Sequence, residues 1–163
     1  MLSKFIATTL TATLLMTAAP VFAALSMVKE VDVTADLTVI TNVKAAAYWT
    51  TVADDLENAI VARLVDRIAD DGAKITVDID ELSLASSFES AANIADSKLV
   101  GAVSVTHDND NTVFDAYALA VGIADAGPFF PEGTDITKIT GNSKEHYDAM
   151  IAAFASRVVA DLK

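Results

Sequence analysis

The chain has 163 residues, no cysteine, and 23 acidic against 11 basic residues, which gives a formal net charge of −12. Without cysteine there is no disulfide framework, thiol nucleophile or thiolate metal site, so packing alone must stabilise the fold. The acidic balance disfavours nucleic acid and anionic lipid surfaces as partners. It suits cationic partners, divalent ions or simple solubility.

The first 23 residues have the layout of a secretory signal peptide. Lys4 supplies a positive start, Phe5–Ala19 is uncharged, and Val21 and Ala23 are small residues at the −3 and −1 positions. We expect cleavage after Ala23, which leaves residues 24–163 as one domain in the periplasm or in the medium of a bacterium, with no stable membrane anchor. The alternative is an N-terminal anchor. It is less favoured because the uncharged run of about 15 residues is shorter than the roughly 20 that a spanning helix needs.

Two elements are predicted in the first half of the chain. Strict alternation of apolar and polar residues from Val31 to Val39 predicts a half-buried strand. Thr41-Asn42 offers a helix N-cap, and apolar residues then recur three or four apart from Ala45 to Asp71. This spacing predicts one long amphipathic helix that ends at Gly72.

A second strand is predicted at Ile75–Ile79, where the alternation resumes. Its phase slips near Asp80-Glu81, which predicts a bulge or a strand end there. The stretch Ala85–Lys98 is small and polar, and we expect a loop or a single loose helical turn.

The remaining pattern predicts a hairpin and a final helix. Leu99–Thr106 and Val113–Ala124 are strand-like and joined by the turn-forming residues His107–Thr112. One face of the second arm carries large side chains and the other carries alanines: Tyr117, Leu119, Val121 and Ile123 against Ala116, Ala118 and Ala120. Asn142-Ser143, with Glu145, signals the start of the last helix, whose apolar stripe includes Tyr147.

The order β-α-β-β-β-α predicts an α+β two-layer sandwich. The two strands flanking the long helix should be parallel, the hairpin-linked strands antiparallel, and both helices should cover one face of a mixed four-stranded sheet. We expect eight residues in the core: Trp49, Leu56, Ile60, Leu64, Leu119, Val121, Phe154 and Val158.

This element order in an exported chain resembles small periplasmic α+β modules. They occur in the lipopolysaccharide-assembly lipoprotein, in the auxiliary lipoproteins of ABC transporters and in the amino-terminal module of the TolB translocation protein. The resemblance is architectural and covers Val31 to Leu162, without the lipidated cysteine of the lipoproteins. It implies a scaffold or adaptor rather than an enzyme.

Carboxylates gather in two places that are candidate metal sites. Asp32, Asp36 and Asp78, with Asp80, fall on the predicted open face of the sheet, where paired carboxylates can hold a divalent ion or act as acid and base. The hairpin turn places Asp108 and Asp110 at alternate positions, as in a calcium loop, but lacks the loop's glycine and glutamate. Solvated acidic surface is the competing interpretation for both places.

Phe129-Phe130, between two prolines, is the candidate contact with a partner. An exposed ring in a stiff loop can anchor an interface, although both rings can also tuck under the loop. His107 lies beside Ser104, Thr106 and Asp108, but neighbours on one strand face opposite sides, so a solvated turn histidine is favoured over a catalytic base.

The sequence thus favours a non-enzymatic binding or scaffold module of the cell envelope, with an envelope protein as partner and no cofactor. The alternative is a divalent-metal-dependent hydrolase or a calcium-binding module that uses the acidic sheet face or the hairpin turn.

Overall fold

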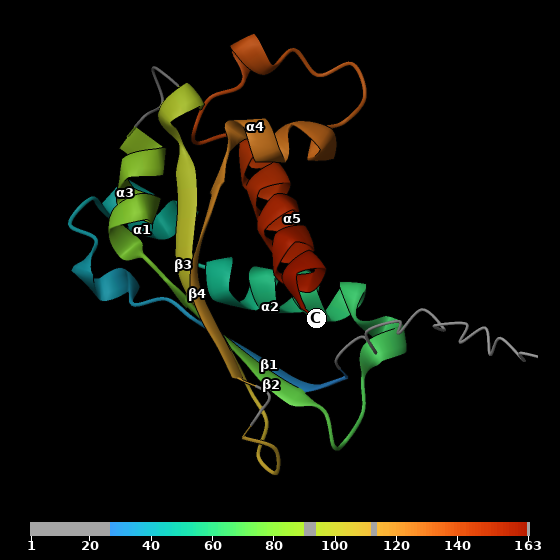
Figure 1. Cartoon of the computed structure of the whole chain (residues 1–163). Helices are drawn as coiled ribbons and strands as arrows, with labels where there is room; N and C mark the ends of the chain where they lie inside the picture. Colours follow the sequence, from blue (N-terminus) through green and yellow to red (C-terminus); the bar gives the residue numbers. More distant parts are fainter. Residues whose placement is uncertain (1–26, 90–93, 112–113, 163) are drawn as a thin grey trace, which may run out of the picture.

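The computed structural model describes residues 27–89, 94–111 and 114–162, so the predicted signal peptide lies outside the described residues (Figure 1). The helices and strands are β1 (Val28–Thr34), α1 (Val43–Tyr48), α2 (Val52–Arg63), β2 (Ala73–Ile79), α3 (Glu81–Glu89), β3 (Lys98–Thr106), β4 (Phe114–Gly122), α4 (Ile123–Ala126) and α5 (Lys144–Asp161).

The four strands form one mixed sheet in the order β1-β2-β3-β4. β1 and β2 are parallel, whereas β3 is antiparallel to both β2 and β4. This confirms the predicted α+β fold, the parallel pair and the hairpin. Thr112 and Val113, at the end of the hairpin turn, lie outside the described residues.

β1 ends earlier than the alternation predicted. It spans Val28–Thr34 rather than Val31–Val39, and the last three predicted residues form a 3₁₀ turn, η1 (Leu37–Val39). The Asp36 carboxylate accepts a hydrogen bond from the Thr38 backbone N–H at 3.1 Å. Such local side-chain bonding competes with strand pairing, so the chain leaves the sheet although its period-two pattern continues.

The helix predicted from Ala45 to Asp71 is wrong in its extent, because α1 and α2 are separate helices on either side of Trp49. Asn42 caps α1 as predicted, accepting hydrogen bonds from two backbone N–H groups. Trp49 is completely buried, and its indole N–H donates to the Leu84 carbonyl at 2.9 Å. Apolar residues on both sides of the break are buried, so the helical spacing of apolar residues in the sequence did not reveal the break.

Gly72 was predicted to end the long helix, and this prediction is wrong. A 3₁₀ turn, η2 (Val65–Arg67), and the return of the chain to the sheet lie between α2 and Gly72. A Cβ atom at Gly72 would lie 2.5 Å from the carbonyl carbon of Val28 and 2.7 Å from the nitrogen of Lys29. The two backbone segments therefore touch, and only glycine fits between them.

The helix α3 begins at Glu81, and its second half lies in the stretch Ala85–Lys98, where a loop or a single turn was predicted. The Asp80 carboxylate accepts a hydrogen bond from the Ser83 backbone N–H at 2.9 Å, which is the interaction of a helix N-cap. The strand thus ends near Asp80-Glu81, one of the two predicted outcomes. Ser87 is buried against β3, where its hydroxyl accepts a hydrogen bond from the Lys98 N–H at 2.9 Å.

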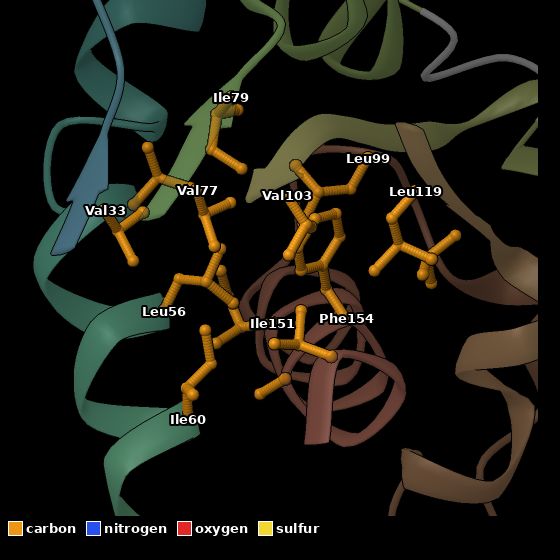
Figure 2. Close-up of a cluster of buried hydrophobic side chains, with 14 of the residues drawn as sticks. Val33, Leu56, Ile60, Val77, Ile79, Leu99, Val103, Leu119, Ile151 and Phe154 are labelled. Atoms are coloured by element: carbon orange, nitrogen blue, oxygen red, sulfur yellow. The ribbon is translucent and has the colours of Figure 1, made fainter. Parts of the chain in front are cut away.

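α2 and α5 pack side by side against one face of the sheet, and the core lies between these two layers (Figure 2). α5 is capped as predicted, since the Ser143 hydroxyl accepts a hydrogen bond from the His146 N–H at 3.1 Å. Ile123, predicted in the last strand, instead begins α4. The eight predicted core residues are all buried: Trp49, Leu56, Ile60, Leu64, Leu119, Val121, Phe154 and Val158.

Candidate functional site

The acidic residues predicted on the open sheet face are only partly brought together. Asp32 and Asp78 lie on adjacent strands, but Asp36 is outside the sheet and caps η1. Asp32 forms an ion pair with Lys74 at 3.2 Å, and Lys74 also contacts Glu30 at 2.7 Å. These carboxylates raise the pKa of Lys74, chiefly through their hydrogen bonds to it, and the ammonium takes the place that a cation would occupy.

The hairpin turn carries a similar neutralising pair. Asp108 forms an ion pair with Lys29 at the start of β1, and the lysine lowers the pKa of Asp108. Asp110 lies exposed in the turn beside it. The nearby His107 contacts the Asp71 carbonyl through Nε2 at 2.6 Å. Across residues 27–89, 94–111 and 114–162, no three carboxylate or histidine side chains lie close enough to hold a metal ion.

Phe129 and Phe130 are both half-buried and pack against the hydrophobic core. Phe129 belongs to a 3₁₀ turn, η5 (Gly127–Phe129), and Phe130 follows it in extended backbone. Neither ring stands free in solvent. Phe129 nevertheless lines a surface groove, together with residues from β4 and α5.

We call this hollow the edge groove. Its larger part has a volume of about 520 Å³ and lies between β4, η5 and α5. A second part of about 280 Å³ lies between β4 and α5 and is lined by Asp115, Tyr117, Ala160 and Asp161. Ala160 lines both parts, so the two parts adjoin each other. Among the described residues, the buried hydroxyl of Tyr117 has no hydrogen-bond partner, and burial raises its pKa to about 12.

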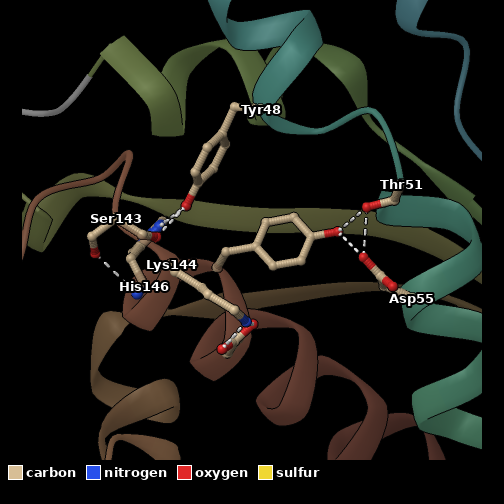
Figure 3. A network of polar contacts seen from close by, with 8 residues as sticks. Tyr48, Thr51, Asp55, Ser143, Lys144 and His146 are labelled. Carbon is tan, nitrogen blue, oxygen red and sulfur yellow. Dashed lines mark hydrogen bonds and ion pairs between the residues drawn. The ribbon is translucent and has the colours of Figure 1, made fainter.

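A polar network on the other side of α5 was not foreseen from the sequence (Figure 3). The Tyr147 hydroxyl donates to the Asp55 carboxylate at 2.6 Å, and the Thr51 hydroxyl donates to the same oxygen at 2.7 Å. The ring of Tyr48 meets that of Tyr147 edge-on, with centroids 5.6 Å apart. The network thus joins the start of α2 to the first turn of α5.

A polar pocket of about 690 Å³ opens over this network, within the size range of ligand sites. The residues that line it include Tyr48, Thr51, Asp55, Lys144, Tyr147 and Asp148. Lys144 is held by Asp148, with Nζ 2.6 Å from a carboxylate oxygen.

Three groups in the pocket have pKa values shifted further away from neutral pH. Hydrogen bonds from Thr51 and Tyr147 lower the pKa of Asp55, and burial raises the pKa of Tyr147. The hydrogen bond to Asp148 raises the pKa of Lys144. These groups are therefore a constant anion, a neutral phenol and a constant cation, whereas general acid–base catalysis needs a pKa near the working pH. In these states the three groups can hold a ligand through charge and hydrogen bonds.

A serine–histidine pair lies behind the pocket. The Nε2 atom of His146 is 2.8 Å from the Ser97 hydroxyl, and its Nδ1 atom is 3.4 Å from the Tyr48 hydroxyl. The distance suits a nucleophile and its base. Both side chains are completely buried, however, and burial lowers the pKa of His146 to about 4. Neither group is open to solvent, and their contact joins the residue before β3 to the first turn of α5.

These arrangements had weak sequence signals. Thr51 and Asp55 are four residues apart, as expected for neighbours on a helix, and Tyr147 was predicted on the buried stripe of the last helix. Ser97 lies in the stretch predicted to be a loop. Nothing in the sequence pairs it with a histidine 49 positions away.

Over the described part of the chain, no helix is both long and apolar enough to cross a membrane. No protein-family model matches this chain, and comparison with curated proteins and with solved structures likewise finds no match.

Proposed function

We propose that this protein is a non-enzymatic binding module of the bacterial cell envelope, and that it contacts a partner protein through the edge groove. The observation that carries this proposal is the groove itself, where Phe129 and the edge strand β4 border an open hollow of about 520 Å³. Interfaces use such a partly buried aromatic ring as an anchor, surrounded by contacts that exclude water.

Binding is favoured over catalysis by the state of the reactive groups. The Ser97 hydroxyl and the His146 imidazole are buried beyond the reach of a substrate. The charged groups of the polar pocket lie in stable ion pairs and hydrogen bonds. The competing function, a divalent-metal-dependent hydrolase or a calcium-binding module, is less favoured because lysines already neutralise Asp32 and Asp108.

The envelope location rests on the N-terminal leader, and intact mass tests it. Protein recovered from the periplasm or the medium should begin at Ala24. A species that retains Met1 in the membrane fraction would contradict the location.

Photo-crosslinking in living cells tests the partner contact. Ala124 is exposed in α4 and lines the edge groove, so p-benzoylphenylalanine at this position should capture a discrete partner protein. Ala62 is an exposed alanine of α2 outside both parts of the groove and is the matched control position. Equal capture from the two positions, or none from Ala124, argues against the proposal.

A further inference from the structure

β4 is an edge strand with few of the features that prevent strand pairing. In the described part of the chain it pairs only with β3, over nine residues in unbroken register. Along this length it carries one charge, Asp115, and no proline. Alternate residues of an edge strand direct their backbone N–H and C=O groups outward, and long apolar edges of this kind readily pair with another chain.

The opposite edge of the same sheet is protected. β1 carries three charged residues, Lys29, Glu30 and Asp32, and its register shifts between Val28 and Glu30. Charged side chains and bulges are the usual protection against unwanted pairing. The difference between the two edges indicates that β4 is kept available for pairing.

The edge groove runs beside β4 and has room for side chains. Its wall on α5 is made of three small residues, Ala153, Ser156 and Ala160, and of Arg157. On the opposite side of the sheet, β4 presents only Ala116, Ala118 and Ala120 to solvent between its ends. A strand laid along β4 would point alternate side chains into the groove and across these alanines, because successive strand residues face opposite sides.

The charges of the groove select among partners. Asp115 and Asp161 lie near the start of β4, and Asp125 lies just beyond its end. Arg157 contacts Asp161 at 3.1 Å, so these four groups leave a negative balance. A second copy of this chain, with a net charge of −12, is repelled by that balance, whereas a basic segment is attracted.

We infer that an extended, basic segment of a partner protein adds to the sheet as a fifth strand along β4. This inference rests on the proposed function and specifies its mode of binding. Backbone hydrogen bonds to β4 supply affinity, the edge groove takes alternate apolar side chains, and Asp115 and Asp125 receive lysine or arginine at the two ends of the segment.

The probe is a synthetic nine-residue peptide with lysine at both ends and alternating valine and threonine between them, matched to the length of β4. Fluorescence anisotropy with the purified full chain should detect its binding. The same peptide with glutamate at both ends should bind at least about tenfold more weakly. Two further versions carry backbone N-methyl groups on alternate residues, one on each edge of the peptide strand.

Only one edge of the peptide faces β4, so one N-methylated version should lose binding and the other should retain it. Attraction between charges alone predicts equal binding of the two, because their charge is identical. Equal binding of both versions, or no binding of the parent peptide, overturns strand addition.

Charge variants of the protein give an independent measurement. Asp115→Lys should weaken binding of the lysine-ended peptide at least about fivefold. Asp54→Lys makes the same change in net charge at an exposed position of α2, outside the groove, and should leave binding within about twofold. Equal effects of the two variants would contradict the assignment of Asp115 as the residue that receives a lysine of the peptide. Matching thermal melts show that both variants fold.

The remaining outcomes separate the inference from the proposed function. Crosslinking at Ala124 without edge-dependent peptide binding rejects strand addition but leaves the partner-binding function in place. Failure of both experiments rejects both. A stable dimer of the chain in sedimentation at micromolar concentration would assign β4 to a second copy instead of a partner.

Discussion

The imidazole Nε2 of His146 lies 2.8 Å from the hydroxyl oxygen of Ser97, and neither side chain has more than a trace of exposed surface. This contact joins the first turn of α5 to the residue before β3. It places a titratable group in the core of an otherwise acidic protein, which makes the stability of the fold sensitive to pH.

We expect His146 to destabilise the protein in mild acid. Burial lowers its pKa from 6.5 to about 4. Below pH 6.5 the unfolded chain therefore binds a proton at this histidine that the folded protein does not bind until near pH 4. Above pH 6.5 the histidine is neutral in both states and the fold keeps its full stability. Stability is lost as the pH falls from 6.5 to about 4.

Between pH 7 and pH 5 this loss amounts to about 2 kcal/mol of unfolding free energy. Urea denaturation of the parent and of His146→Gln at the two pH values measures it. The variant lacks the titrating ring, so its stability should change less by about this amount. An identical pH dependence in both proteins would show that the histidine is not the responsible group.

Gly72→Ala should destabilise the fold by about 1–3 kcal/mol, because the new methyl group meets the backbone of β1. The matched control is Gly122→Ala, since a Cβ atom there has no neighbour closer than 3.8 Å and the backbone is extended. Chemical denaturation should give a control variant as stable as the parent. Similar stabilities of the two variants would contradict the close approach of Gly72 to Val28.

Tyr147→Phe should reduce stability by about 1–3 kcal/mol, because it removes a hydrogen bond to a charged carboxylate. A double-mutant cycle with Asp55→Asn isolates the pair, and a coupling energy of about 0.5–3 kcal/mol is expected. A coupling near zero would mean that the hydroxyl and the carboxylate do not interact in solution.

Leu64→Ala should lower the free energy of unfolding by about 2–5 kcal/mol, because Leu64 is completely buried. The adjacent Val65 is 74% exposed, and Val65→Ala should change stability by less than about 0.5 kcal/mol. Equilibrium denaturation of the two variants thus tests whether Leu64, and not Val65, is the residue buried in the core at the end of α2.

Millimolar calcium, magnesium or manganese should leave the thermal melt unchanged, because Lys74 and Lys29 occupy the acidic positions. A ligand that binds only the folded form at about 100 times its dissociation constant adds roughly 2.7 kcal/mol of stability. A clear rise in the melting temperature with one ion would revive the metal-dependent alternative.

Patterns with a short period predicted much of this fold from the sequence. Alternation located β2 and the β3–β4 hairpin, because each strand has one buried and one open face. The break at Trp49 was missed because the apolar spacing continues across it. The start of α3 was missed although Asp80 caps it, because serine, a weak helix former, supplies three of its nine residues.

The candidate sites were harder to predict because they join distant parts of the chain. Phe129 was identified from its neighbours in sequence, but its groove is completed by α5 and β4. The Tyr147–Asp55 pair spans 92 positions. Single-sequence patterns report which face of an element is buried, and they contain no information on which two side chains meet there.

The connection lengths in the mixed sheet also favour one order of assembly. The β3–β4 pair closes over the short span between Thr106 and Phe114, whereas the parallel β1–β2 pair closes over the much longer span of residues 35–72. Loop-closure entropy favours the hairpin first and β1 last. β1 follows closely after the predicted leader. In a chain still attached through its leader, the strand that docks last would therefore be the one nearest the point of attachment. Folding would then finish near the N-terminus, after the rest of the sheet has formed.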